Sequence, residues 1–89
     1  MVTVILTFEC KDFESWKIVF DADEARRTNA GLTLSGIYTT VESPNHVTLI
    51  FDAESVEGFS AMMTDPELAE KMQESGVMGP PTVSILNKV

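Results

Sequence analysis

The chain has 89 residues, with 14 acidic and 6 basic side chains, and its formal net charge at pH 7 is −8. A chain this acidic repels nucleic-acid phosphates and anionic membranes, so we expect neither as a partner. The length fits one domain, residues 1–89, and a hydrophobic content of 44% excludes a disordered chain.

The sequence holds a single cysteine, Cys10, which cannot form a disulfide within the chain and so favours a reducing compartment. The first residues lack the positively charged segment and the cleavage site of a secretory signal peptide. No apolar run approaches the roughly 20 residues that a membrane span requires. We therefore expect the protein to lie in the cytoplasm.

The order of the predicted elements is the most informative feature of the chain. In chain order they are a strand at 2–8, a helix at 13–30, strands at 32–40 and 47–51, a helical stretch at 56–75 and a strand at 82–86. This β-α-β-β-α-β order predicts an α+β fold of the ferredoxin-like type, with one four-stranded antiparallel sheet. A turn at Ser43-Pro44-Asn45 joins the middle strands, and Gly36 indicates a bulge in the strand before it.

The first strand predicts a sheet that is covered on both faces. One face carries large apolar side chains at positions 2, 4, 6 and 8, whereas Thr3, Ile5 and Thr7 lie on the other. A sheet face that is exposed to water usually carries more charge than this second face does. We therefore expect the second face to contact the sheet of another copy, in a face-to-face homodimer.

The first helix has signals at both ends. Asp12 is a suitable N-cap, and Gly31 ends the helix as its C′ residue. One face of the helix carries, in order, Phe13, Trp16, Val19, Phe20, Asp23, Arg27 and Ala30. An apolar stripe that becomes charged while still facing the sheet indicates either a cavity or the end of the core.

The second helical stretch divides in two. Asp65 and Pro66 form a new helix start, as N-cap and first helical residue, so we expect a break near Thr64. Gly76 ends the second piece, and the segment 79–81, Gly-Pro-Pro, leads into the last strand. The apolar side includes flexible side chains that suit an adaptable cavity or a core, namely Met62, Met63 and Met72.

Asp23, Arg27 and His46 are the candidate catalytic residues. Asp23 or His46 would move a proton, and Arg27 would stabilise a developing oxyanion. The alternative for Asp23 and Arg27 is an ordinary ion pair between positions i and i+4 of one helix. The alternative for His46 is a solvated residue at the start of a hairpin strand.

The candidate substrate-binding residues are aromatic. Phe13, Trp16 and Phe20 would stack on an aromatic or apolar ligand, and the alternative for all three is core packing. Tyr38 would add a hydroxyl, if the bulge at Gly36 turns it toward the same cavity. The chain has no His/Cys cluster and no glycine-rich phosphate loop, so we expect no metal and no cofactor.

Four segments carry a family resemblance: 13–21, Arg27 followed by Gly31-Leu32, Ser43-Pro44-Asn45, and 76–81. On these segments the chain resembles the dimeric α/β-barrel superfamily, and within it small bacterial proteins of the cyclase-like and antibiotic-biosynthesis-monooxygenase-like kinds. The resemblance implies ferredoxin-like subunits that pair sheet to sheet, with a pocket between each sheet and its own helices. Members include cofactor-free monooxygenases of aromatic compounds, haem-handling enzymes, isomerases and lyases.

The chain departs from its relatives at two positions. Relatives often carry a histidine in place of Asp23 and an acidic residue in place of His46. Any chemistry that the histidine performs in those relatives is therefore not expected at Asp23 of this chain. The resemblance leaves two functions open, a cofactor-free enzyme and a non-enzymatic binding or sensor protein. A regulatory amino-acid-binding domain and a metallochaperone are disfavoured, the latter because the chain has no Cys-x-x-Cys pair.

Overall fold

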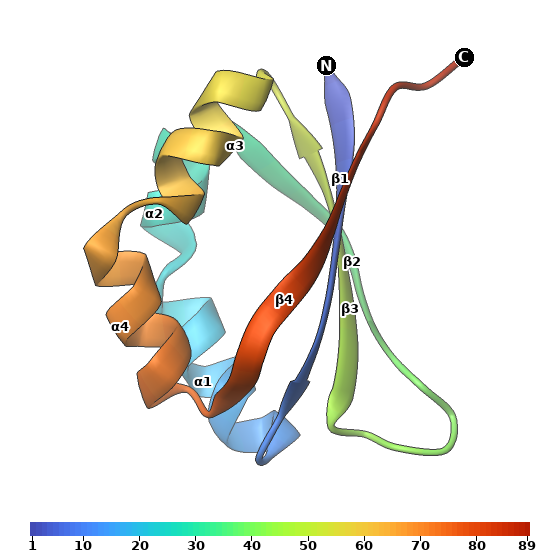
Figure 1. Ribbon diagram of the computed structural model, residues 1–89, viewed down its shortest axis with the longest axis vertical. Helices are drawn as coiled ribbons and strands as arrows, with labels where there is room; N and C mark the ends of the chain where they lie inside the picture. Colours follow the sequence, from blue (N-terminus) through green and yellow to red (C-terminus); the bar gives the residue numbers. More distant parts are fainter.

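The computed structural model describes all 89 residues and has two layers, a β-sheet and a set of helices on one of its faces (Figure 1). Its elements are β1 (Val2–Cys10), α1 (Phe13–Ala22), α2 (Glu24–Asn29), β2 (Leu32–Thr39), β3 (His46–Ala53), α3 (Val56–Met63), α4 (Pro66–Glu74) and β4 (Val77–Leu86). The sheet is antiparallel, with the strand order β2-β3-β1-β4. The predicted ferredoxin-like fold is therefore confirmed. None of the helices has the length and apolar character needed to cross a membrane.

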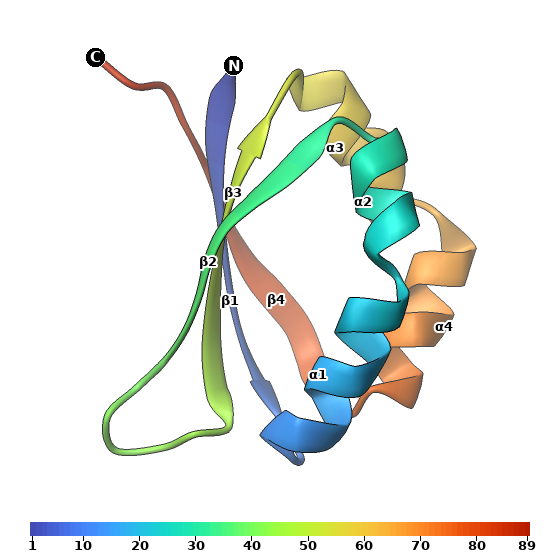
Figure 2. The same ribbon diagram turned by 180° about the vertical axis from the view of Figure 1, so that it is seen from behind.

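The prediction of one continuous helix at 13–30 is wrong, because the helix breaks at Asp23. This residue has backbone angles of φ −99° and ψ 18°, and it ends α1 and begins α2. Aspartate is disfavoured in helix interiors because its short side chain forms hydrogen bonds with nearby backbone groups in place of the helical ones. Figure 2 shows α1 and α2 following one another over the same face of the sheet.

The predicted break in the second helical stretch is confirmed. Thr64 ends α3, and the Asp65 carboxylate then caps α4 by accepting a hydrogen bond of 2.9 Å from the Glu67 N–H. The other two capped helices, α1 and α3, have Asp12 and Ser55 as their N-caps. Both helical segments are thus pairs of short helices with a bend in the middle.

Three strands are longer than predicted, and one of them, β3, spans His46–Ala53 rather than 47–51. β1 continues to Cys10, and β4 begins at Val77 rather than at residue 82, because its first residues pair with the end of β1. Pro80-Pro81 lies beside a shift in register between Thr7 and Glu9 of β1. β4 is an edge strand, where the missing proline N–H groups do not interrupt a central ladder.

The two faces of the sheet have different surroundings. The inner face and the helices form one core, which contains Val4, Leu6, Phe8, Cys10, Trp16, Leu32, Val47, Leu49, Phe51, Ala53, Phe59 and Met62. The outer face is covered by no helix (Figure 1), and at its centre Ile5 of β1 lies opposite Ile50 of β3. The predicted alternation of inner and outer side chains along the strands is therefore present in the sheet.

The bulge predicted at Gly36 is confirmed by a register shift between Leu34 and Gly36 where β2 pairs with β3. The ring of Tyr38 lies over Gly36, and a Cβ atom on Gly36 would be 2.7 Å from Cε2 of Tyr38. Tyr38 pairs with Thr48, whose neighbours in β3 are buried on the inner face. Tyr38 therefore points to the outer face.

Candidate functional site

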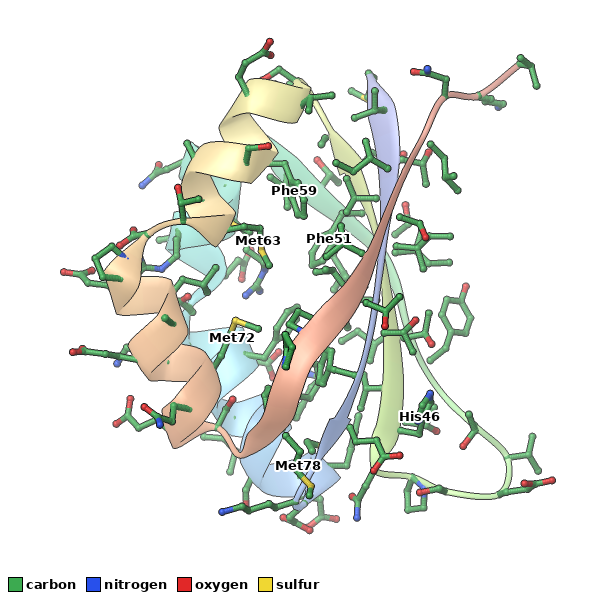
Figure 3. The ribbon with its side chains drawn as sticks, in the orientation of Figure 1. His46, Phe51, Phe59, Met63, Met72 and Met78 are labelled. Atoms are coloured by element: carbon green, nitrogen blue, oxygen red, sulfur yellow. The ribbon has the colours of Figure 1, made fainter.

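A largely apolar cavity of about 70 Å³ lies between the helices and the inner face of the sheet. The sheet contributes Leu6, Phe8, Leu49, Phe51, Val77 and Pro81, and the helices and their ends contribute Trp16, Val19, Phe20, Asp23, Arg27, Met62, Met63, Leu68, Lys71, Met72 and Ser75. Figure 3 shows Met63 and Met72 directed from the helices into the space in front of the sheet. Apart from Ser75, the polar lining side chains are Asp23, Arg27 and Lys71.

Stacked aromatic rings form one wall of the cavity. The rings of Trp16 and Phe20, one helical turn apart on α1, stack with their centroids 4.8 Å apart and their planes 25° apart. Phe8 of β1 packs on Trp16 at 5.4 Å, and Phe51 of β3 packs on Phe20 at 6.4 Å. Trp16 is only 3% exposed. The same rings therefore serve as core and as cavity wall, which combines the two sequence interpretations.

Arg27 extends this wall with a charged group. Its guanidinium carbon lies 3.7 Å from the centroid of the Phe20 ring, in a cation–π contact. Its Nη1 donates a hydrogen bond of 2.7 Å to the Phe20 carbonyl oxygen. Burial lowers the pKa of the Arg27 guanidinium, and the nearby acids, of which Asp23 acts most strongly, oppose this only in part.

Asp23 lines the cavity, but its partner is Arg26 and not Arg27. Nε of Arg26 lies 3.0 Å from the Asp23 carboxylate, and each of the two side chains is 17% exposed. The i, i+4 ion pair between Asp23 and Arg27 that the sequence allowed is therefore replaced by an i, i+3 pair. The break at Asp23 explains the change, because the regular helical spacing ends there.

The remaining candidate residues lie outside the cavity. His46 points away from the helices, on the outer side of the sheet (Figure 3), and its Nδ1 lies 3.5 Å from Oε1 of Glu9. Tyr38 is on the outer face and is 56% exposed. Phe13 packs on Trp16 at 5.6 Å without lining the cavity. The structure thus brings together Asp23, Arg27, Trp16 and Phe20 of the predicted set.

Sequence reasoning missed two basic residues near the site. Lys71 lines the cavity from α4, and Arg26 holds Asp23 in place. The apolar pattern of α4 predicts that Met72 lies near the sheet. Lys71 is the residue before Met72, and this is the only feature of the sequence that indicates a position for Lys71 near the cavity. No group of histidine, cysteine and acidic side chains is arranged to hold a metal ion.

Comparison with solved structures identifies the same fold in several proteins. The chain is similar to a candidate antibiotic biosynthesis monooxygenase from Bordetella bronchiseptica, with a TM-score of 0.81, 17% identity, and coverage of 99% of this chain and 96% of that one. SnoaB, a cofactor-independent oxygenase from Streptomyces nogalater, gives a TM-score of 0.77 at 12% identity, with 99% and 92% covered. Protein Atu4242 from Agrobacterium tumefaciens gives 0.71 at 18% identity, with 100% and 94% covered.

These TM-scores show a common fold, which is that of the antibiotic biosynthesis monooxygenases, and the predicted resemblance is confirmed at the level of the fold. The chain matches no protein-family model and no curated protein sequence.

Proposed function

We propose that the protein binds a small apolar or aromatic molecule in the cavity between its sheet and its helices. One observation carries this proposal, namely that the cavity wall consists of stacked rings and methionines with a few convergent polar groups. Apolar walls with a small number of placed polar groups are the usual composition of small-molecule sites.

The size of the cavity sets the size of the ligand. Its volume of about 70 Å³ is well below the roughly 300 Å³ of typical ligand pockets, so the walls must move to admit even a single aromatic ring. Met63 and Met72 supply this adaptability, because unbranched thioether side chains change rotamer at little cost. A compound with one ring is therefore the expected ligand class.

Trp16 allows a direct test, since it is the only tryptophan and lines the cavity. Titration with benzamide should change its fluorescence in a saturable way and raise the unfolding temperature. Met72→Phe, which puts a stiff ring in the cavity, should weaken binding, whereas Met78→Phe, at a side chain that is 54% exposed, should not. Equal binding by the two variants, or no binding of benzamide or benzoate by the native chain, would contradict the proposal.

A cofactor-free enzyme is the second candidate function. Arg27 would stabilise negative charge on a ligand oxygen, and Asp23, beside it in the cavity wall, would exchange a proton. SnoaB, a neighbour in fold, is a cofactor-independent oxygenase. Native mass spectrometry of freshly purified protein, before and after incubation in air, separates the candidates. A retained compound whose mass changes indicates an enzyme, and one that stays unchanged indicates a binding protein.

The proposed protein partner is a second copy of the chain, bound through the outer face of the sheet. This face has Ile5 opposite Ile50 at its centre and no helix over it. Ile5→Asp should convert a dimer to a monomer in sedimentation experiments, because it places a charge in the middle of the interface. Ile18→Asp is the matched control, since Ile18 lies on α1 and is 72% exposed. A native chain that sediments as a monomer would exclude this interface.

The net charge and the single cysteine bear on which partners and which compartment we propose. A net charge of −8 disfavours nucleic acids and anionic membranes as partners. The only cysteine, Cys10, is a buried free thiol, which fits a reducing cytoplasm. The proposed partners are thus a second copy of the chain and a small molecule.

A further inference from the structure

Arg27 is the only partly buried cation of this chain without a carboxylate partner. Lys17 and Arg26 are also partly buried, and each forms an ion pair. The guanidinium of Arg27 forms a cation–π contact with the ring of Phe20 and a hydrogen bond with its carbonyl oxygen, and no ion pair. A partly buried charge without an ion-pair partner is costly, and here it persists in a chain with 14 acidic and 6 basic residues.

Three acids act on the charge of Arg27, namely Asp23, Glu24 and Asp21, and the only one that lines the cavity is engaged elsewhere. Asp23 lines the same cavity, but both of its carboxylate oxygens accept hydrogen bonds from Nε of Arg26, at 3.0 and 3.3 Å. Arg26 in turn is anchored to Asp65 and Glu67 at the start of α4. The carboxylate of Asp23 is thus held on Arg26, and no carboxylate lies within ion-pair distance of Arg27.

The guanidinium of Arg27 also keeps free donors. It has five N–H groups, and the structure uses only one of the Nη1 hydrogens, in the bond to the Phe20 carbonyl. Phe20 covers one face of the guanidinium plane, and this contact fixes the plane and leaves edge donors available. Lys71, which also lines the cavity from α4, has its ammonium 3.5 Å from the carboxylate of Glu74, so Arg27 is the cavity cation without an ion pair.

We propose that the ligand of this cavity is a small aromatic carboxylate, with its ring against the Trp16–Phe20 wall and its carboxylate on the edge of the Arg27 guanidinium. This inference rests on the proposed function, since it names the class of molecule that the cavity takes. A carboxylate matches the arginine fork because it offers two coplanar oxygens to two parallel N–H groups. It also supplies the direct ion-pair partner that Arg27 lacks within the protein.

Benzoate and benzamide test this inference, because they have nearly the same shape and only benzoate carries a charge near neutral pH. Binding of each is followed by Trp16 fluorescence at low salt. The native chain should bind benzoate at least about tenfold more tightly than benzamide, a difference of about 1.4 kcal/mol. The preference should shrink as salt is added.

Three variants make the test specific. Arg27→Met should bind both compounds equally. Arg27→Lys should retain part of the preference for benzoate, because lysine keeps the positive charge but lacks the two parallel N–H groups of arginine. Lys17→Met is the matched control, because it removes the same charge from a side chain that does not line the cavity and should leave the preference unchanged. Circular dichroism of each variant verifies the fold, and Arg27→Lys serves if Arg27→Met does not fold.

Each outcome separates this inference from the proposed function. Equal binding of benzoate and benzamide by the native chain would overturn the carboxylate assignment and leave the apolar binding site standing. A preference for benzoate that persists in both Arg27 variants would also overturn it, by placing the carboxylate elsewhere. Binding of neither compound would remove the binding site and the assignment together.

Discussion

Arg26 and Asp65 connect the two bent pairs of helices at their bends. Nη1 of Arg26 contacts Oδ2 of Asp65 at 2.5 Å, while Nε contacts Asp23 and Nη2 contacts Glu67, each at 3.0 Å. Asp23 separates α1 from α2, and Asp65 caps α4 directly after the break at Thr64. We call this group of one arginine and three acids the Arg26 clasp. Glu67 and Asp23 raise the pKa of the Arg26 guanidinium, so it stays charged.

Removing the charge at Arg26 should lower the temperature of unfolding. Arg26→Met keeps most of the side-chain length but leaves three carboxylates close together without their cation, so they repel one another. In about 1 M salt, where the Debye length is about 3 Å, the difference from the native chain should become smaller. Lys17→Met removes a single exposed ion pair and should change little. Equal melting of both variants would show that the clasp adds no stability.

Gly58→Ala should destabilise the protein, although alanine is usually the better helix residue. A Cβ atom at this position of α3 would lie 2.7 Å from the carbonyl oxygen of Ala30, which is backbone and cannot rotate away. We expect a net loss of up to about 2 kcal/mol in urea denaturation, because overpacking costs about 1–3 kcal/mol and the helix-propensity gain is about 1 kcal/mol. Ser60→Ala, at an exposed position of the same helix, is the control and should be neutral or slightly stabilising.

Gly36→Ala should cost less than Gly58→Ala, although the close contact has the same length. The atom that a new Cβ would meet is Cε2 of Tyr38, at the far end of a side chain that is 56% exposed and free to turn. In the double variant with Tyr38→Ala the cost should disappear, which a double-mutant cycle of unfolding free energies measures. Additive effects of the two substitutions would show that the ring does not restrain Gly36.

Cys10 should react slowly with alkylating reagents at neutral pH. Burial, together with the negative charge of Asp12, raises the pKa of this thiol, so the reactive thiolate forms only above the usual thiol range. The rate of iodoacetamide labelling, compared with that of the chain in guanidinium chloride, checks this. Fast labelling of the folded chain near pH 7 would contradict it.

The same thiol should make the stability of the protein depend on pH in the alkaline range. Above the ordinary thiol pKa the unfolded chain releases a proton that the folded chain keeps, so the free energy of unfolding should fall as pH rises. Below that pKa both states are protonated and the thiol has no effect. Cys10→Ala should remove this part of the alkaline loss, and an unchanged pH profile in the variant would assign the loss to other groups.

Most of the fold could be predicted because it depends on local signals. Asp12 and Asp65 cap their helices through neighbouring backbone N–H groups, and Gly36 marks its bulge within one strand. The break at Asp23 could not be predicted, because the apolar stripe continues across it from Phe20 to Arg27. Its causes lie partly in contacts with residues about 40 positions away, in the Arg26 clasp.

The residues of the candidate site that also pack in the core could be predicted from the sequence. Trp16 and Phe20 were found because an apolar helix face must pack on the sheet, and the cavity lies in that same layer. His46 and Tyr38 were placed by residue type alone, and the alternation of β2 and β3 puts both on the opposite face. The separation of Asp23 from Arg27 depends on side-chain pairing, which a sequence pattern does not encode.

The strand order has a consequence for how the chain reaches its native state. β1, the first of the eight elements, is an inner strand between β3 and β4, and β4 is synthesised after the other seven. Until then β1 has one unsatisfied hydrogen-bonding edge, and the Phe8–Trp16 side of the cavity lacks Val77 and Pro81. Cooperative folding of this sheet therefore has to await synthesis of β4, and a nascent chain paused before β4 exposes one edge of β1 that can pair with another chain.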